Sequence, residues 1–296
     1  MNRRLVILNP VAGRGRVRRE WPGMAQALRA AGVTFDVVET REPGEAIDLA
    51  ERATRDYDVV IAAGGDGTVH EVVNGLLRAG SGAALGVLPL GSGDDFAKML
   101  PSGDAIERIA RGTARAFDAG RIEAGRTDVT RYFANGMDIG FGAHGAYNLR
   151  KVPRLLTGLG AYLGALAMTL VRYPKLVVSL QLDGGEVFTQ TTAMTAVMNG
   201  RAFGGSFHVC PAAQADDGEL DLLIADGVGR LAILGLVPRI MRGAHAGDPR
   251  LKLLRARRVL IESAAPLLVE ADGEIAFEDA RRLEIEVLPG VLRVLT

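Results

Sequence analysis

The stretch AAGGDGTVHEVVNGL, residues 62–76, places an aspartate inside a glycine turn. The segment before it, YDVVIAAGG, is typical of a buried strand, and the segment after it, TVHEVVNGLLRAG, has helical spacing and ends at Gly80. Glycine backbone N–H groups and the start of a helix favour phosphate binding. Because Asp66 would repel a phosphate unless a cation lay between them, the turn predicts a phosphate site organised by Mg²⁺.

Two more glycine-rich loops occur in the first half of the chain: NPVAGRGR, residues 9–16, and PLGSGDDF, residues 89–96. Strand and helix patterns alternate through these first 120 residues, which predicts a parallel sheet with helices on both faces. Ligands bind outside the carboxyl ends of the strands in such a sheet, so the three loops should share one edge. The Rossmann and P-loop fingerprints are not found, which disfavours those enzymes. Helix capping is the alternative explanation for Asp66 and for Asp95.

The second half of the chain has a different character. From Phe117 onward it reads mostly as strands, and many of its turns carry Asp-Gly, Asn-Gly or Gly-Gly pairs. Two helical segments, at about 143–171 and 229–242, interrupt the strands. The pattern predicts an antiparallel β domain, and a chain of 296 residues has room for two domains.

Composition narrows the classes of function. Lys plus Arg and Asp plus Glu both number 35, so the net charge is zero and no global field attracts nucleic acid. The one cysteine, Cys210, excludes a disulfide framework and a Cys-based zinc site, and we expect it to be a buried hydrophobe. The longest uncharged run, residues 155–171, falls short of a membrane span, and the N-terminal apolar run is too short for a signal peptide. These features predict a cytoplasmic protein.

The set NPVAGRG, GGDGTVHEVVNGL and LPLGSGDDFA resembles the diacylglycerol kinase catalytic family, which includes bacterial lipid kinases and sphingosine kinases and is related to NAD kinases. Four later segments resemble the same family in order and spacing: FDAGRI (117–122), FANGMDIGFGAHGA (133–146), CPAAQADDGELDLLI (210–224) and VEADGEI (269–275). The resemblance implies an NAD kinase/diacylglycerol kinase-like fold. It consists of an α/β ATP-binding domain with a parallel sheet, residues 1–117, and a mainly antiparallel β-sandwich lipid-substrate domain, residues 118–285. The final strand, about 286–296, would pack back on the first domain.

The activity that this resemblance implies is ATP- and Mg²⁺-dependent phosphorylation of a hydroxyl of a membrane lipid such as diacylglycerol. The enzyme would act at the inner face of the membrane. The resemblance allows a homodimer but does not require one. An NAD kinase-type enzyme is one alternative. A nucleotide-binding regulatory protein that has lost catalysis is the other, and Asp94, which stands where the family usually has Asn, is its best argument.

The resemblance also assigns site residues position by position. It implies ATP contacts for Asn9, Thr40, Gly64, Gly65, Asp66, Gly67, Thr68, Val69, His70, Gly91, Ser92, Gly93 and Asp95. Asp66, Asp95 and Asp118 would form an acidic network that organises Mg²⁺. A second, structural Mg²⁺ would be bound by the side chain of Asp217 and the carbonyls of Gln214 and Glu219.

The resemblance places the proton acceptor in the segment VEADGEI. Residues i and i+2 of an extended segment point the same way, so both Asp272 and Glu274 could reach the reacting hydroxyl. We expect Glu274 to be the acceptor, with Asp272 as the alternate and Asp66 next. A solvated hairpin turn is the competing interpretation.

A membrane-facing surface is predicted for residues 148–175, where basic ends surround an apolar centre. Basic residues near anionic lipid favour binding to a bilayer surface. A core helix with solvated flanks is the alternative.

Overall fold

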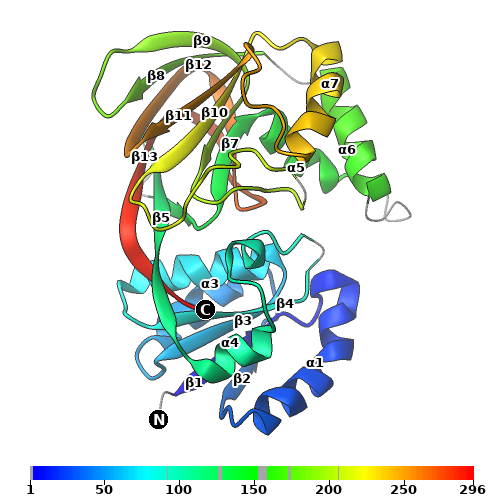
Figure 1. Ribbon diagram of the computed structural model, residues 1–296, viewed down its shortest axis with the longest axis vertical. Coiled ribbons are helices and arrows are strands. Elements are labelled where there is room, and N and C mark those ends of the chain that lie inside the picture. The colour runs from blue at the N-terminus through cyan, green and yellow to red at the C-terminus, as the bar shows by residue number, and fades with distance from the viewer. Residues whose placement is uncertain (1–2, 92, 126–128, 153–158, 173–174, 206) are drawn as a thin grey trace. The chain divides into compact units, whose positions relative to one another are not determined.

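The computed structural model describes residues 3–91, 93–125, 129–152, 159–172, 175–205 and 207–296 (Figure 1). The chain forms two compact units. Unit 1 comprises Met1–Ala119 together with Pro289–Thr296, and unit 2 comprises Gly120–Leu288. The end of the C-terminal strand, from Pro289 onward, therefore belongs to the first unit, although the earlier part of the same strand lies in the second.

Unit 1 is built on a parallel sheet. Four strands lie in the order β4-β3-β1-β2: β1 (Arg4–Leu8), β2 (Asp36–Glu39), β3 (Val59–Gly64) and β4 (Ala84–Pro89). The end of the long strand β13 (Glu274–Leu295) adds to β4 in parallel, with Val294 opposite Leu85. The unit's helices are α1 (Ala12–Ala30), α2 (Glu45–Ala53), α3 (Asp66–Ala79), the short 3₁₀ helix η1 (Ala97–Met99) and α4 (Ala105–Arg111).

Burial explains why this sheet forms. All six residues of β3 are buried, as expected for a strand that is covered on both faces. Helices α2 and α3 pack closely because α3 carries a glycine at the contact. A Cβ on Gly75 would lie 2.2 Å from the carbonyl oxygen of Ile47, so only glycine lets the two helix backbones approach.

Unit 2 is mainly antiparallel. Its strands lie in the order β11-β10-β9-β7-β12-β13, while β8 pairs with β12 and β9, and β5 pairs with β6 and β13. The strand bounds are β5 (Ala114–Ala124), β6 (Thr130–Phe133), β7 (Gly136–Gly140), β8 (Leu176–Leu182), β9 (Phe188–Met198), β10 (Leu220–Asp226), β11 (Leu251–Ala256) and β12 (Arg258–Ala271). Their inward side chains enclose one large apolar core that includes Phe133, Val197 and Ile261.

Three helices gather at one side of unit 2: α5 (Phe141–Leu149), α6 (Leu159–Arg172) and α7 (Arg230–Met241) (Figure 1). The single helix predicted at 143–171 is wrong, because two helices occupy this region. Pro153 gives a local reason, since the residue before a proline avoids the helical conformation. Cys210 is buried, as expected.

Within the described ranges, no helix combines the length and the apolar character that crossing a bilayer requires.

Candidate active site

The glycine loops after β3 and β4 touch each other at the carboxyl end of the unit 1 sheet. The N–H of Leu90 donates to the carbonyl of Gly64 at 2.8 Å. A Cβ on Gly91 would lie only 2.6 Å from the Cα of Gly65, so this backbone contact requires glycine. The two loops thus lie side by side, as the strand order predicts.

The loop after β1 joins the same edge through Asn9. Its Nδ2 donates to Thr68 Oγ1 on α3 at 3.1 Å, and its Oδ1 accepts the N–H of Val11. Thr40, at the end of β2, donates its N–H to the carbonyl of Leu8 at 2.9 Å. The expected nucleotide contacts Asn9, Thr40 and Thr68 are therefore neighbours along one sheet edge. Ser92 lies outside the described residues.

Asp66 ties the second and third loops together. Its Oδ1 accepts the N–H groups of Asp95 at 2.6 Å and of Phe96 at 3.4 Å. It does not cap its own helix, because Gly65 is the N-cap residue of α3 and no side chain caps that end. A Cβ on Gly93 would lie 2.6 Å from Asp66 Oδ2, so the third loop packs directly on this carboxyl group.

Burial and, after it, the nearby negative charge of Asp95 together raise the pKa of Asp66 to about 6. Asp95 is buried and its Oδ1 pairs with Lys98 Nζ at 2.8 Å. The helix-capping explanation does not apply to Asp95 either, since η1 has no side-chain cap. Two carboxylates so close together favour a cation between or beside them.

Asp94 closes the third loop on itself. It has a left-handed backbone with φ of 51°, and its Oδ1 accepts the N–H of Gly91 at 2.9 Å. Burial raises its pKa. An asparagine oxygen could accept the same hydrogen bond, so the shape of the loop does not depend on the negative charge.

Asp118 has a different environment. It lies buried on β5, and its Oδ1 accepts the N–H of Gly290 at 2.7 Å, which links β5 to the returning part of β13. Across the described part of the chain, no three His, Cys, Asp or Glu side chains form a group that could hold a metal ion. A preformed three-carboxylate cluster of Asp66, Asp95 and Asp118 is therefore not seen, whereas Asp66 and Asp95 do come together.

Val69 and His70 lie buried in α3, where the carbonyl of His70 accepts a hydrogen bond from Asn74 Nδ2 at 2.9 Å. The side chain of His70 also contacts this turn of the helix, because its Nε2 lies 3.4 Å from Asn74 Nδ2. Gly67 is also part of α3, in the first turn after Asp66.

In unit 2, Asp272 anchors a turn. Its Oδ2 accepts the N–H of Ala134, and its Oδ1 accepts the N–H groups of Asn135 and Gly136, all at 2.9–3.0 Å. These bonds hold the connection between β6 and β7 against the turn between β12 and β13. The carboxylate is committed to backbone amides, which is typical of a structural role.

Glu274 has a different partner from Asp272. Its side chain is half exposed, and its Oε2 accepts a hydrogen bond from Arg150 Nη2 at 2.5 Å, at the end of α5. The expectation that Asp272 and Glu274 point the same way is not met. The backbone between them is a turn rather than an extended segment, with φ of 50° at Asp272 and 92° at Gly273.

A structural Mg²⁺ at Asp217 does not fit this arrangement. Asp217 Oδ1 accepts the N–H of Glu219, and Oδ2 is bonded to the guanidinium of Arg255. The same guanidinium lies 2.9 Å from Glu219 Oε2 and 3.8 Å from Asp221 Oδ1. Gln214 is exposed. Arg255 supplies the positive charge that the resemblance assigns to Mg²⁺, so we derive no role for a metal there.

This contact predicts that the stability of the protein does not depend on a divalent cation at Asp217. EDTA should leave the Tm unchanged, whereas Arg255→Gln should lower it by about 2–4 °C, the effect of losing a partly exposed ion-pair network worth about 1 kcal/mol. Arg258→Gln is the matched control, because among the described residues Arg258 makes one ion pair, a long 3.8 Å contact to Glu286. If EDTA lowers the Tm of the parent but not that of Asp217→Asn, a metal ion does bind at Asp217.

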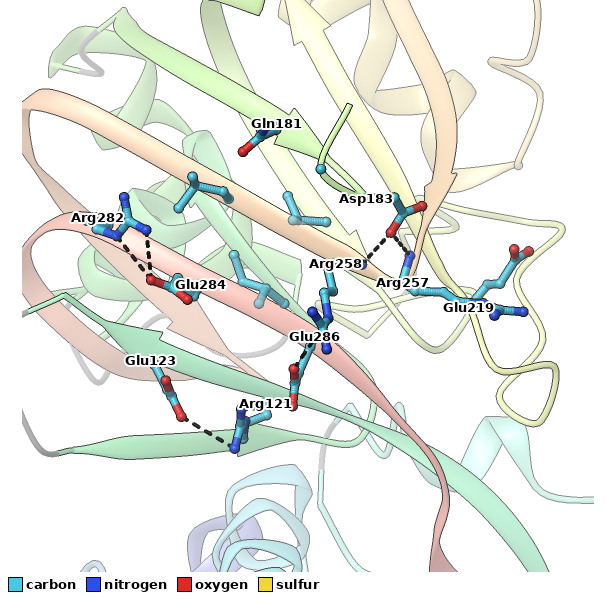
Figure 2. A pocket seen from close by; sticks show the side chains of 14 residues that line it. Arg121, Glu123, Gln181, Asp183, Glu219, Arg257, Arg258, Arg282, Glu284 and Glu286 are labelled. Carbon is cyan, nitrogen blue, oxygen red and sulfur yellow. Dashed lines mark hydrogen bonds and ion pairs between the residues drawn. The ribbon is translucent and has the colours of Figure 1, made fainter. Parts of the chain in front are cut away.

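A cavity of about 840 Å³ lies elsewhere in unit 2, on β5, β12 and β13. Figure 2 shows its acidic and basic side chains paired along the sheet, including Arg282 with Glu284 and Arg121 with Glu123. Of the expected site residues, only Glu219 lines it. Because positive and negative groups alternate, the cavity favours no one class of ligand.

Comparison with known proteins identifies the family of this chain. A family model described as diacylglycerol kinase catalytic domain matches residues 3–122. A second, described as YegS C-terminal NAD kinase beta sandwich-like domain, matches residues 134–296, more than half of the chain. The chain belongs to the diacylglycerol kinase family. Membership confirms the expected two-domain fold and the expected enzyme class, a lipid kinase.

Relatives in this family are similar over nearly their whole length. A diacylglycerol kinase of Bacillus subtilis is 30% identical over 281 residues, which cover 93% of this chain and 90% of that protein. One from Mycobacterium tuberculosis is 31% identical and covers 98% of this chain and 93% of its own. A solved structure from Bacillus anthracis shares the fold with a TM-score of 0.79 at 24% identity, covering 99% of this chain and 96% of that one.

Near Glu274, the sequence drew attention to Arg150 only as a basic residue that flanks the predicted membrane-facing segment, and it did not single out Asp138 or Glu270. A signal was present for the last two, because each is an acid within an apolar strand, in the segments MDIG and LLVEA. Arg150 gave no comparable signal, since basic residues at helix ends are common.

Proposed function

We propose that this member of the diacylglycerol kinase family transfers the γ-phosphoryl group of ATP to the hydroxyl of diacylglycerol or a closely related membrane lipid. The observation that carries the proposal is the bridge that Asp66 makes between the second and third glycine loops. It supports a phosphate site whose backbone amides and carboxylates lie together at one sheet edge.

The loops of unit 1 would bind the nucleotide. N–H groups of the glycine turns and the start of α3 suit the phosphates, and Asn9, Thr40 and Thr68 line the same edge. Asp66 and Asp95 fit Mg²⁺, which takes one or two carboxylates together with phosphate oxygens. The ion would neutralise charge that develops on the transferring phosphoryl group.

Glu274 would act as the base on the side of the lipid substrate. Its side chain is half exposed and has one partner, Arg150, through one oxygen in the described contacts. The other oxygen could accept the proton of the lipid hydroxyl, a step that typically contributes about 10²–10⁴-fold. Asp272 is less suited, because three backbone N–H groups already occupy its oxygens.

An assay with labelled ATP tests the function against both alternatives. We expect label in a lipid product when vesicles containing diacylglycerol are present, and none in NADP when NAD is offered. Label in NADP would establish the NAD kinase-type activity. Nucleotide binding without transfer to any lipid of a broad panel would favour the regulatory protein, for which Asp94 is the motivation.

Association with the membrane surface is part of the proposal. Two apolar side chains on α6, Met168 and Val171, and two on α7, Leu231 and Leu234, are 39–84% exposed. Lys151 stacks over the ring of Tyr147 at the start of the same region. Exposed apolar groups flanked by basic residues suit the surface of an anionic bilayer. Arg154 and its immediate neighbours lie outside the described residues.

We expect the protein to co-sediment with anionic vesicles and to be released by salt. Each basic residue near the surface is worth about 1 kcal/mol, so the double change Lys151→Gln with Lys175→Gln should weaken partitioning by roughly 25-fold. Arg78→Gln with Arg281→Gln removes two exposed charges elsewhere and should change partitioning far less. Binding that ignores both salt and anionic lipid would rule out this docking surface.

A further inference from the structure

Two acidic residues face each other in the interior of unit 2. Asp138 on β7 and Glu270 on β12 are direct partners in the antiparallel register, so their side chains lie on the same face of the sheet. Asp138 has no exposed surface, and Glu270 is 3% exposed. Like charges in this position are destabilising, and burial increases the cost.

The surroundings of Asp138 and Glu270 favour one way to avoid this repulsion, in which the two carboxyl groups share a proton. The neighbouring strands place apolar residues opposite the pair, Ala196 on β9 and Ile275 on β13. On α5, His144 directs its Nδ1 to the carbonyl of Gly140. Burial raises the pKa of both acids, and for Glu270 the charges of Asp138 and then Asp272 raise it further. The two acids therefore titrate as a pair that retains a proton near neutral pH.

Each acid contacts one of the two elements that hold Glu274. Glu270 Oε1 accepts the N–H of Gly273, the residue between Asp272 and Glu274. Asp138 lies against the first turn of α5, where a Cβ on Gly142 would be 2.5 Å from its Oδ2. The other end of α5 carries Arg150, whose guanidinium bonds Glu274 Oε2.

We infer that Asp138 and Glu270 are a positioning pair that sets the orientation of Glu274, through the β12–β13 turn on one side and through α5 on the other. The inference rests on the proposed role of Glu274 as proton acceptor. Buried acids can often be replaced by apolar residues with no loss of stability, so a role in stability alone gives little reason for their presence.

The pair also makes stability depend on pH in a defined direction. Because folding raises the pKa of both acids, the folded state binds more protons than the unfolded chain between about pH 4 and the folded pKa, which is about 7 for Asp138. The free energy of unfolding should therefore fall as pH rises through this window. Asp138→Asn removes one of the two charges and should flatten the dependence.

The first experiment measures Tm from pH 4.5 to pH 8.5. We expect the decline in the parent to be much smaller in Asp138→Asn and unchanged in Glu278→Gln, a control that neutralises an exposed acid on β13. Equal pH dependence in the parent, Asp138→Asn and the control would overturn the shared-proton pair. This measurement does not depend on catalysis, so it stands or fails apart from the proposed function.

The second experiment compares two changes at Glu270. Glu270→Ala removes the acceptor for the Gly273 N–H, and we expect kcat to fall at least tenfold with the KM for ATP unchanged. Glu270→Gln keeps an oxygen for that N–H and can donate to Asp138, so it should restore most of the activity. Parental kcat in Glu270→Ala, or a KM effect equal to the kcat effect, would contradict a positioning role. If Glu270→Ala does not fold, the same kinetic comparison is made between Asp138→Ala and Asp138→Asn, and parental kcat in Asp138→Ala would contradict the positioning role.

Discussion

Asp66→Asn should abolish nearly all kinase activity and leave the protein folded. An asparagine oxygen can still accept the N–H groups of Asp95 and Phe96, so the two loops stay joined. The lost negative charge is the one proposed to hold Mg²⁺ at the phosphates. Removing one group that stabilises charge in a transition state typically costs about 10²–10³-fold, and loss of the ion adds to this.

The measurement is kcat at saturating Mg²⁺, together with Tm. The Tm should be equal to or above that of the parent, because burial and the charge of Asp95 both disfavour the ionised form of Asp66. Asp94→Asn is the matched control, since it neutralises an acid in the same loop and keeps the acceptor for the Gly91 N–H. Parental turnover of Asp66→Asn at saturating Mg²⁺ would show that the role assigned to Asp66 is wrong.

Glu274→Gln should lower kcat by about 10²-fold or more, with the KM for ATP little changed, because a base acts in the transition state and not in nucleotide binding. Glutamine keeps an oxygen that can accept from Arg150, so the side chain should stay in place. Steady-state kinetics at several ATP concentrations separate the two parameters.

The comparison variant is Asp272→Asn. An amide has one oxygen in place of two, so it cannot accept all three backbone N–H groups, and we expect a lower Tm with a smaller effect on kcat. If Asp272→Asn alone removes kcat, the assignment of the base moves to Asp272. If neither variant loses kcat, this turn is structural and Asp66 becomes the first candidate.

Local patterns in the sequence were enough for much of the fold. The alternation of strand and helix through residue 120 predicts a parallel sheet, and the turn pairs of the second half predict antiparallel strands, because both depend on neighbours in the chain. The single helix predicted at 143–171 was wrong because the apolar run gave no sign that α5 ends at Leu149 and that a second helix, α6, begins at Leu159.

The sequence by itself determined that glycine-rich loops follow β1, β3 and β4, that the last two also carry acids, and hence that these loops share an edge. Only the tertiary structure decided what each acid contacts. Asp66 reaches across to Asp95, Asp272 to the turn after β6, Glu274 to Arg150, Asp217 to Arg255, and Asp138 to Glu270. These partners lie 29–138 residues apart in the chain. Hydrogen bonds and shared protons depend on distances of about 3 Å, and such distances are created by sheet pairing and packing rather than by spacing along the sequence.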